Sequence, residues 1–154
     1  MYLGNPTFIN CTMVGNQARI SCGGAIYDPN GQATLKNCIL WGNTSTRGVT
    51  EASQIGGGVN GIFPGALLRR ARRLVRDQRA QHRSSLRHPS NGNYELLKSS
   101  PCKNAGESVL PADIGNLDWD MDYEEPIPLD LNLSNRVTQG ALDLGAYEVP
   151  LDIE

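Results

Sequence analysis

The segments NPTFINCTMVGN (residues 5–16) and QATLKNCILWGN (residues 32–43) decide the fold, because they are two copies of one repeat. Five residues recur between them at a constant offset of 27 positions. The recurring pairs are Thr7/Thr34, Asn10/Asn37, Cys11/Cys38, Gly15/Gly42 and Asn16/Asn43. A constant offset of this kind is typical of stacked repeats, so we predict that equivalent residues lie side by side in neighbouring copies.

The second copy shows what each repeat contains. Residues 34–40 alternate in polarity and predict one short strand, which runs through Trp41 into a Gly-Asn turn. Residues 23–28 predict a second strand, and Pro29-Asn30-Gly31 predicts a turn. A single repeat cannot bury its apolar face, but stacked repeats bury a common core when their strands pair about 4.8 Å apart. We also expect stacked asparagines to form amide ladders, at 10/37 and at 16/43.

Composition agrees with an all-β fold of this kind. Of 154 residues, 39% are hydrophobic and only 6% aromatic, so the core must consist mainly of aliphatic side chains. The 17 glycines and 9 prolines favour many turns over long helices. No apolar stretch approaches the roughly 20 residues of a spanning helix, so we expect no transmembrane segment. The first residues show no signal peptide, and we expect the chain to begin within a fold.

Three further motifs lie near the C-terminus, and with the two repeats they resemble a known family. They are NGNYEL (91–96), SPCKNAG (100–106) and GALDLGAYE (140–148). Together the five motifs resemble the end of right-handed parallel β-helix proteins of the choice-of-anchor Q type, relatives of pectin-lyase-like proteins and polymorphic outer-membrane repeats. The resemblance covers residues 1–58 and 89–149.

This resemblance implies an all-β fold: the terminal rungs of a right-handed parallel β-helix, followed by an irregular closing segment over 101–150. It also implies a bacterial extracellular or cell-surface protein, with upstream rungs of the same longer chain as partners. We therefore divide the chain into β-helix rungs (1–58), an atypical segment (59–88) and a C-terminal closing segment (89–154).

The atypical segment interrupts the motifs with a block of arginines. Residues 69–88 hold eight arginines and one aspartate, a charge of +7, although the whole chain carries −2. Apolar residues over 66–80 are spaced to line one face of a helix. Three interpretations remain open: a basic amphipathic helix for lipid or nucleic acid, a solvated insertion, or an out-of-frame peptide that replaces one rung. We favour the last, because codons for 82–87, read one base along, can encode Ile-Asp-Pro-Leu-Phe-Val; no nucleic-acid partner is expected.

An acidic stretch gives the only candidate metal site. Asp118, Asp120 and Asp122 alternate along residues 117–125, and oxygen ligands at loop positions 1, 3 and 5 suit Ca²⁺. The glycine and the distal glutamate of a complete EF-type loop are missing, since Tyr123 and Leu129 occupy those positions. The alternative is an exposed acidic loop without an ion.

Two functions of different classes remain. The favoured one is a non-catalytic surface or secreted protein that binds polysaccharide or cell-surface glycans through the lateral face of the repeats. The rival is the remnant of a polysaccharide lyase or glycoside hydrolase, whose paired carboxylates would have to come from the Asp113–Asp122 loop. We predict no catalytic residues, and Tyr27 and Trp41 are candidates either for sugar stacking or for packing.

The four cysteines have no zinc-binding spacing. Cys11 and Cys38 share a position in the repeat, and we expect buried free thiols there in preference to a disulfide. The partner of Cys102, if it has one, would lie in the replaced rung, and the state of Cys22 stays open.

Overall fold

The computed structural model describes residues 6–20, 22–29, 33–46, 48, 51–57, 86–106, 112, 119–124, 126, 129–137 and 141–150. Over these residues the protein is mostly β, with short strands and almost no helix, as predicted for an all-β chain. The chain divides into two compact units, Met1–His82 and Arg83–Glu154. The division falls inside the Arg-rich segment, whose residues 59–85 lie outside the described part.

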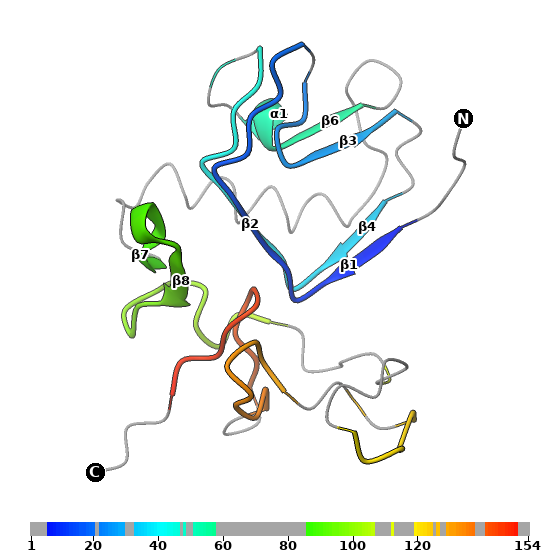
Figure 1. The fold of residues 1–154 in the computed structure, drawn as a ribbon, viewed down its shortest axis with the longest axis vertical. Helices are drawn as coiled ribbons and strands as arrows, with labels where there is room; N and C mark the ends of the chain where they lie inside the picture. Colours follow the sequence, from blue (N-terminus) through cyan, green and yellow to red (C-terminus); the bar gives the residue numbers. More distant parts are fainter. Residues whose placement is uncertain are drawn as a thin grey trace. The chain divides into compact units, whose positions relative to one another are not determined.

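Strands of the two repeats pair in parallel, copy against copy. Strand β1 (Thr7–Ile9) pairs with β4 (Thr34–Lys36), and β2 (Thr12–Val14) pairs with β5 (Ile39–Trp41). Every residue in both registers faces the residue 27 positions along, from Thr7↔Thr34 to Val14↔Trp41. Figure 1 shows the blue and cyan traces of the two repeats running side by side. The predicted pairing of equivalent residues is confirmed.

A sharp corner divides each repeat where one strand was predicted. The chain turns between β1 and β2 at Asn10 and between β4 and β5 at Asn37, and both residues have φ of +49°. The single strand expected over 34–40 is therefore wrong. Asparagine is one of the few residues that enter the left-handed region at small cost, which explains why both copies carry it here.

The third strand of each repeat pairs at a slightly different offset. Strand β3 (Ile26–Asp28) lies parallel to β6 (Ile55–Gly57) in the register Ile26↔Ile55, an offset of 29. The second copy is longer by two residues and contains the short helix α1 (Glu51–Gln54) immediately before β6. The offset of 27 thus holds through the isolated Gln17↔Thr44 bridge and changes afterwards.

The segment before β3 passes close to the backbone of both repeats. A Cβ atom at Gly24 would overlap the carbonyl oxygen of Thr44 and crowd that of Asn16. The Gly24 N–H donates to Ser53 at 2.5 Å, and the Ala25 N–H donates to Gln54 at 3.0 Å. Glycine at position 24 therefore lets the chain reach the third strand without displacing the second repeat.

The core of this unit is small and aliphatic, as the composition predicted. Its buried members are Ile26, Cys38, Leu40 and Ile55. Residues of the first repeat that pack against them, such as Phe8 and Met13, are only partly buried. The second repeat is thus better covered than the first.

A polar ladder joins the two repeats to α1. Asn43, which is fully buried, accepts hydrogen bonds at Oδ1 from the backbone N–H and from Nδ2 of Asn16, both at 2.9 Å. Its own Nδ2 donates to Gln54 Oε1 at 2.7 Å and to the Met13 carbonyl at 2.9 Å. The predicted 16/43 ladder is confirmed. The predicted 10/37 ladder is wrong, because neither amide atom of buried Asn10 has a hydrogen-bond partner among the residues that the structure describes.

The second unit begins with a hairpin. Strand β7 (Leu86–His88) pairs antiparallel with β8 (Asn93–Leu96) across the 3-10 helix η2 (Pro89–Asn91). Leu86 and Leu96 face each other and are both buried, and Arg87 forms an ion pair with Glu95 at 3.4 Å. The hairpin starts inside the segment assigned as atypical. The described residues after it form loops and isolated bridges, in agreement with the predicted irregular closing segment.

The Asn43 ladder generates the first prediction. Asn43→Ala removes the side-chain hydrogen bonds to Gln54 Oε1, to the Met13 carbonyl and to Asn16, and leaves Gln54 Oε1 only the 3.4 Å bond from the backbone N–H of residue 43. A buried unpaired polar group costs about 1–3 kcal/mol. We expect the free energy of unfolding, measured by urea denaturation, to fall by about 3 kcal/mol or more. Asn16→Ala, at the exposed end of the ladder, should cost only about 1 kcal/mol. Equal losses for the two variants would show that burial does not govern the ladder.

The left-handed corner generates the second prediction. Asn10→Gly keeps a φ of +49° accessible and removes a buried amide that bonds nothing. We expect unfolding experiments to give equal or higher stability for this variant, by up to about 1 kcal/mol. Asn10→Ala should be less stable than Asn10→Gly, because alanine in the left-handed region costs about 1–2 kcal/mol. A clear loss of stability in Asn10→Gly would contradict the assignment of Asn10 to a backbone role.

Candidate functional site

The predicted calcium loop is exposed where the structure describes it. Asp118 lies outside the described residues, whereas Asp120 and Asp122 are both exposed. Each accepts a hydrogen bond from the backbone two residues on, Asp120 from the Asp122 N–H at 2.7 Å and Asp122 from the Glu124 N–H at 3.0 Å. Within the described part of the chain, no group of three or more His, Cys, Asp or Glu residues is arranged so that it could hold a metal ion. The calcium assignment therefore stays a prediction that depends on Asp118.

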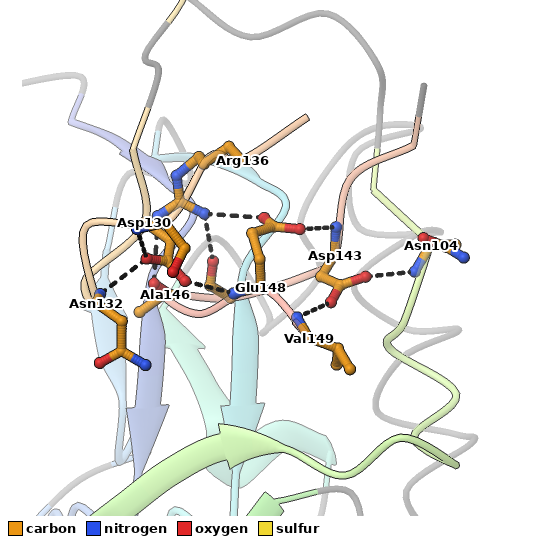
Figure 2. A network of polar contacts seen from close by, with 10 residues as sticks. Asn104, Asp130, Asn132, Arg136, Asp143, Ala146, Glu148 and Val149 are labelled. Carbon is orange, nitrogen blue, oxygen red and sulfur yellow. Dashed lines mark hydrogen bonds and ion pairs between the residues drawn. The ribbon is translucent and has the colours of Figure 1, made fainter. Parts of the chain in front are cut away.

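A different set of charged residues is buried in the closing segment. Its members are Asp130, Arg136, Asp143 and Glu148. Figure 2 shows them joined into one network with the backbone of Asn104, Ala146 and Val149. We refer to these four side chains as the closing network. The GALDLGAYE motif contains two of them, Asp143 and Glu148, and its sequence predicts no role for either.

Asp130 organises the loop that precedes the motif. Its Oδ1 accepts the backbone N–H groups of Asn132 and Ser134, each at 2.8 Å, and so closes a tight turn. Its Oδ2 accepts the N–H of Glu148 at 2.8 Å. One carboxylate therefore ties the 130–134 turn to the end of the motif.

Asp143 joins three segments in the same way. It accepts the N–H of Asn104 at 2.6 Å on one oxygen and the N–H of Val149 at 2.6 Å on the other. Its own N–H donates to Glu148 Oε2 at 2.9 Å. Next to it, Leu142 is 1% exposed and accepts the N–H of Gly106, so the polar contacts lie beside an apolar core.

Arg136 and Glu148 form the buried ion pair of the network. Their Nη1 and Oε1 atoms are 3.3 Å apart, and the two side chains are 7% and 3% exposed. The guanidinium also donates to the carbonyls of Gly145 at 3.2 Å and Ala146 at 3.3 Å. Its Nε has no hydrogen-bond partner in the described part of the chain, so the pairing is incomplete at one atom.

The network contains three carboxyl groups and one cation, and this imbalance affects Glu148. Burial, the largest cause, and the negative charges of Asp143 and Asp130 together raise the pKa of Glu148 from 4.5 to about 7. The backbone N–H of Asp143 and the charge of Arg136 act in the opposite direction. Near neutral pH, Glu148 is therefore divided between its protonated and ionised forms.

A carboxyl group that titrates near pH 7 can act as an acid or base, so its access to a substrate decides its role. Glu148 is almost fully buried, and each of its oxygens accepts a hydrogen bond from the protein. The oxygens of Asp130 and Asp143 are used in the same way, by backbone N–H groups. The arrangement holds loops together, because each of these carboxylate oxygens accepts at least one hydrogen bond from the protein.

The two equivalent cysteines occupy matching environments. Cys11 Sγ lies 3.2 Å from the Ile9 carbonyl, and Cys38 Sγ lies 3.1 Å from the equivalent Lys36 carbonyl. All four cysteines are free thiols, as expected for this pair. The side-chain contact with Cys11 and then burial raise the pKa of the Cys38 thiol, so it stays protonated and acts as a small apolar group.

The two aromatic candidates for sugar stacking differ in exposure. Tyr27, in the middle of β3, is 58% exposed, whereas Trp41 at the end of β5 is only partly exposed. The register partner of Tyr27 is Gly56, which has no side chain to cover the ring. Of the two, Tyr27 is the better candidate for contact with a ligand.

The raised pKa of Glu148 generates the third prediction. Because the folded protein binds this proton more tightly than the unfolded chain, the proton stabilises the fold below pH 4.5, and the stabilisation is lost as pH rises through 7. A shift of this size corresponds to about 3 kcal/mol. Glu148→Gln cannot titrate. We measure the free energy of unfolding in urea for the wild type and for Glu148→Gln at pH 4.5 and at pH 7. Relative to the variant, the wild type should lose about this amount of stability between the two pH values. A difference between the two proteins that does not change with pH would contradict the raised pKa.

Comparisons with known proteins do not identify a relative. No family model matches the chain, and neither the curated proteins nor the solved structures give a match. Within the described residues, no helix has the length and apolar character needed to cross a bilayer. The case for a function therefore depends on the chain's own pairing, burial and exposed side chains.

Proposed function

We propose that the chain is the terminal part of a right-handed parallel β-helix from a secreted or cell-surface bacterial protein of the choice-of-anchor Q type. The observation that carries this proposal is the parallel pairing of two successive strands and a bridge at one offset of 27 residues. Two repeats that pair strand for strand in parallel are the unit from which a β-helix is built. The matching corners at Asn10 and Asn37 support the same interpretation.

In this proposal the closing segment ends the stack and has no catalytic role. Its buried carboxylates accept hydrogen bonds from backbone N–H groups of three segments. This is expected for a segment that must hold irregular loops together without a sheet. A protein of this kind acts through its surface. The lateral strands would then provide the contact with polysaccharide or cell-surface glycans.

Tyr27 is the side chain on which glycan binding can be tested. Aromatic rings bind sugars by stacking on their apolar faces, and the exposed ring beside Gly56 leaves room for such a contact. Tyr123, at 54% exposed, is a matched tyrosine in the other unit.

The fourth prediction uses this pair. On a microarray of bacterial and plant cell-wall polysaccharides, the wild type should bind at least one class, and Tyr27→Ala should lose about tenfold or more in affinity, as expected for about 1.4 kcal/mol of stacking. Tyr27→Phe should retain binding, and Tyr123→Ala should not change it. Absence of binding to every polysaccharide, or equal binding by Tyr27→Ala, would overturn the glycan assignment.

A further inference from the structure

Two thiols lie side by side where the two repeats meet. The registers of β1 with β4 and of β2 with β5 place Cys11 opposite Cys38, immediately before β2 and β5 begin. The Ile39 N–H donates to the carbonyl of Cys11 at 2.8 Å, so the two cysteines occupy neighbouring positions on adjacent backbones. Their side chains are in contact, and both belong to the apolar core cluster of the first unit.

The hydrogen of each thiol is directed at the backbone. Cys11 Sγ lies 3.2 Å from the carbonyl oxygen of Ile9. Cys38 Sγ lies 3.1 Å from the carbonyl oxygen of Lys36 and 3.4 Å from that of Phe8. A carbonyl only accepts hydrogen bonds, so these contacts use the S–H hydrogens and not the sulfur lone pairs. The lone pairs are the electrons through which a metal ion is bound.

The spacing of the repeats suits an ion with two ligands in a line. Paired strands lie about 4.7–4.9 Å apart. A thiolate binds a metal such as Zn²⁺ at about 2.3 Å, so two such bonds in a line span about 4.6 Å. Cu(I) and Ag(I) are soft monovalent ions that bind two thiolates in this linear geometry, and thiolate and thioether sulfur are the ligands that Cu(I) prefers.

The surroundings of the pair agree with a soft ion and not with zinc. A structural zinc site needs four ligands, and among the described residues no group of three His, Cys, Asp or Glu is arranged to hold a metal. Cys38 is 5% exposed, and the side chains that share its cluster are apolar. One of them, Met13, adds a thioether to the same cluster. The pair therefore offers sulfur in a dry environment.

We propose that Cys11 and Cys38 form a binding site for a soft monovalent ion, Cu(I) or its redox-inert analogue Ag(I), held in a line between the two repeats. Binding forms two metal–sulfur bonds, breaks the two S–H bonds and releases two protons to water. The occupied site keeps one negative charge, which water can solvate at Cys11 because this residue is only half-buried. The ion clamps the first repeat to the second, and its binding does not depend on the glycan contact at Tyr27.

An anaerobic titration with Cu(I), supplied as its bicinchoninate complex, tests the site. The wild type should remove one ion per chain from the complex, seen as loss of the colour of the complex. Cys11→Ala and Cys38→Ala should each weaken binding by about 100-fold or more, since loss of a group that only orients a ligand costs about 10–100-fold. Cys22→Ala and Cys102→Ala are the matched controls and should bind as the wild type does.

A further variant keeps the test valid if an alanine at position 11 or 38 prevents folding. The double variant Cys22→Ala/Cys102→Ala retains only the proposed pair, and it should still bind one Cu(I). X-ray absorption of this loaded variant should show sulfur neighbours alone around the copper. Saturating Ag(I) should raise its melting temperature, because the ion binds the folded state.

Four outcomes would overturn the proposal. They are no uptake of Cu(I) by the wild type, unchanged affinity in a folded Cys11→Ala or Cys38→Ala variant, loss of binding in the double variant, and nitrogen or oxygen neighbours around the bound copper. Equal affinity for Zn²⁺ would also overturn it, because two thiols in a line do not complete a zinc site.

Discussion

The first unit depends on the hydrogen bonds of one buried side chain, Asn43. Parallel strands of three residues contribute few backbone bonds, and the core beside them is small. Asn43 adds donors and acceptors that link the first repeat, the second repeat and α1 at one point. Since each of these bonds would be costly to leave unmade, the ladder fixes the register that the apolar side chains alone would leave open to slippage.

In the second unit, charged side chains hold the backbone segments together. Its described residues after the hairpin have only isolated bridges, so their backbone groups cannot be satisfied by a sheet. Asp130 and Asp143 replace the missing strands, because each carboxylate accepts N–H groups from two or three places in the chain. The consequence is an excess of buried negative charge, which Arg136 only partly balances and which Glu148 relieves by binding a proton near neutral pH.

The repeat made the strand pairing of the first unit predictable. The two features that it did not predict, the corner at Asn37 and the offset of 29, have physical causes. A constant offset of 27 predicts which residues lie side by side, but it does not show where the chain bends. The strand predicted over 34–40 divides at Asn37, which has a left-handed backbone conformation. The alternation of polarity in the sequence continues through Asn37, so it does not reveal this corner. The offset of 29 at β3 and β6 arises from two extra residues between Thr44 and Ser53, and no identity between the copies marks them.

The closing network was harder to predict, because its members are far apart in sequence and belong to no repeat. The GALDLGAYE motif indicated a closing element, but nothing local shows that Asp143 and Glu148 turn inward or that Arg136 lies between them. By contrast, alternating acids such as Asp120 and Asp122 attract attention as metal ligands, although both are exposed. Spacing identifies ligands only where neighbouring backbone leaves their oxygens free.

Asparagine shows how the same residue can serve two purposes in one repeat. At positions 10 and 37 the backbone conformation explains its presence, since both residues adopt φ of +49° and the amide of Asn10 bonds nothing. At positions 16 and 43 the amide itself is needed, because it carries the contact between repeats. A repeated asparagine in a stacked fold is therefore evidence for a ladder only after its φ angle has been considered. Where φ is positive, glycine can replace it; where the amide bridges two repeats, no other side chain of that length supplies both the donor and the acceptor.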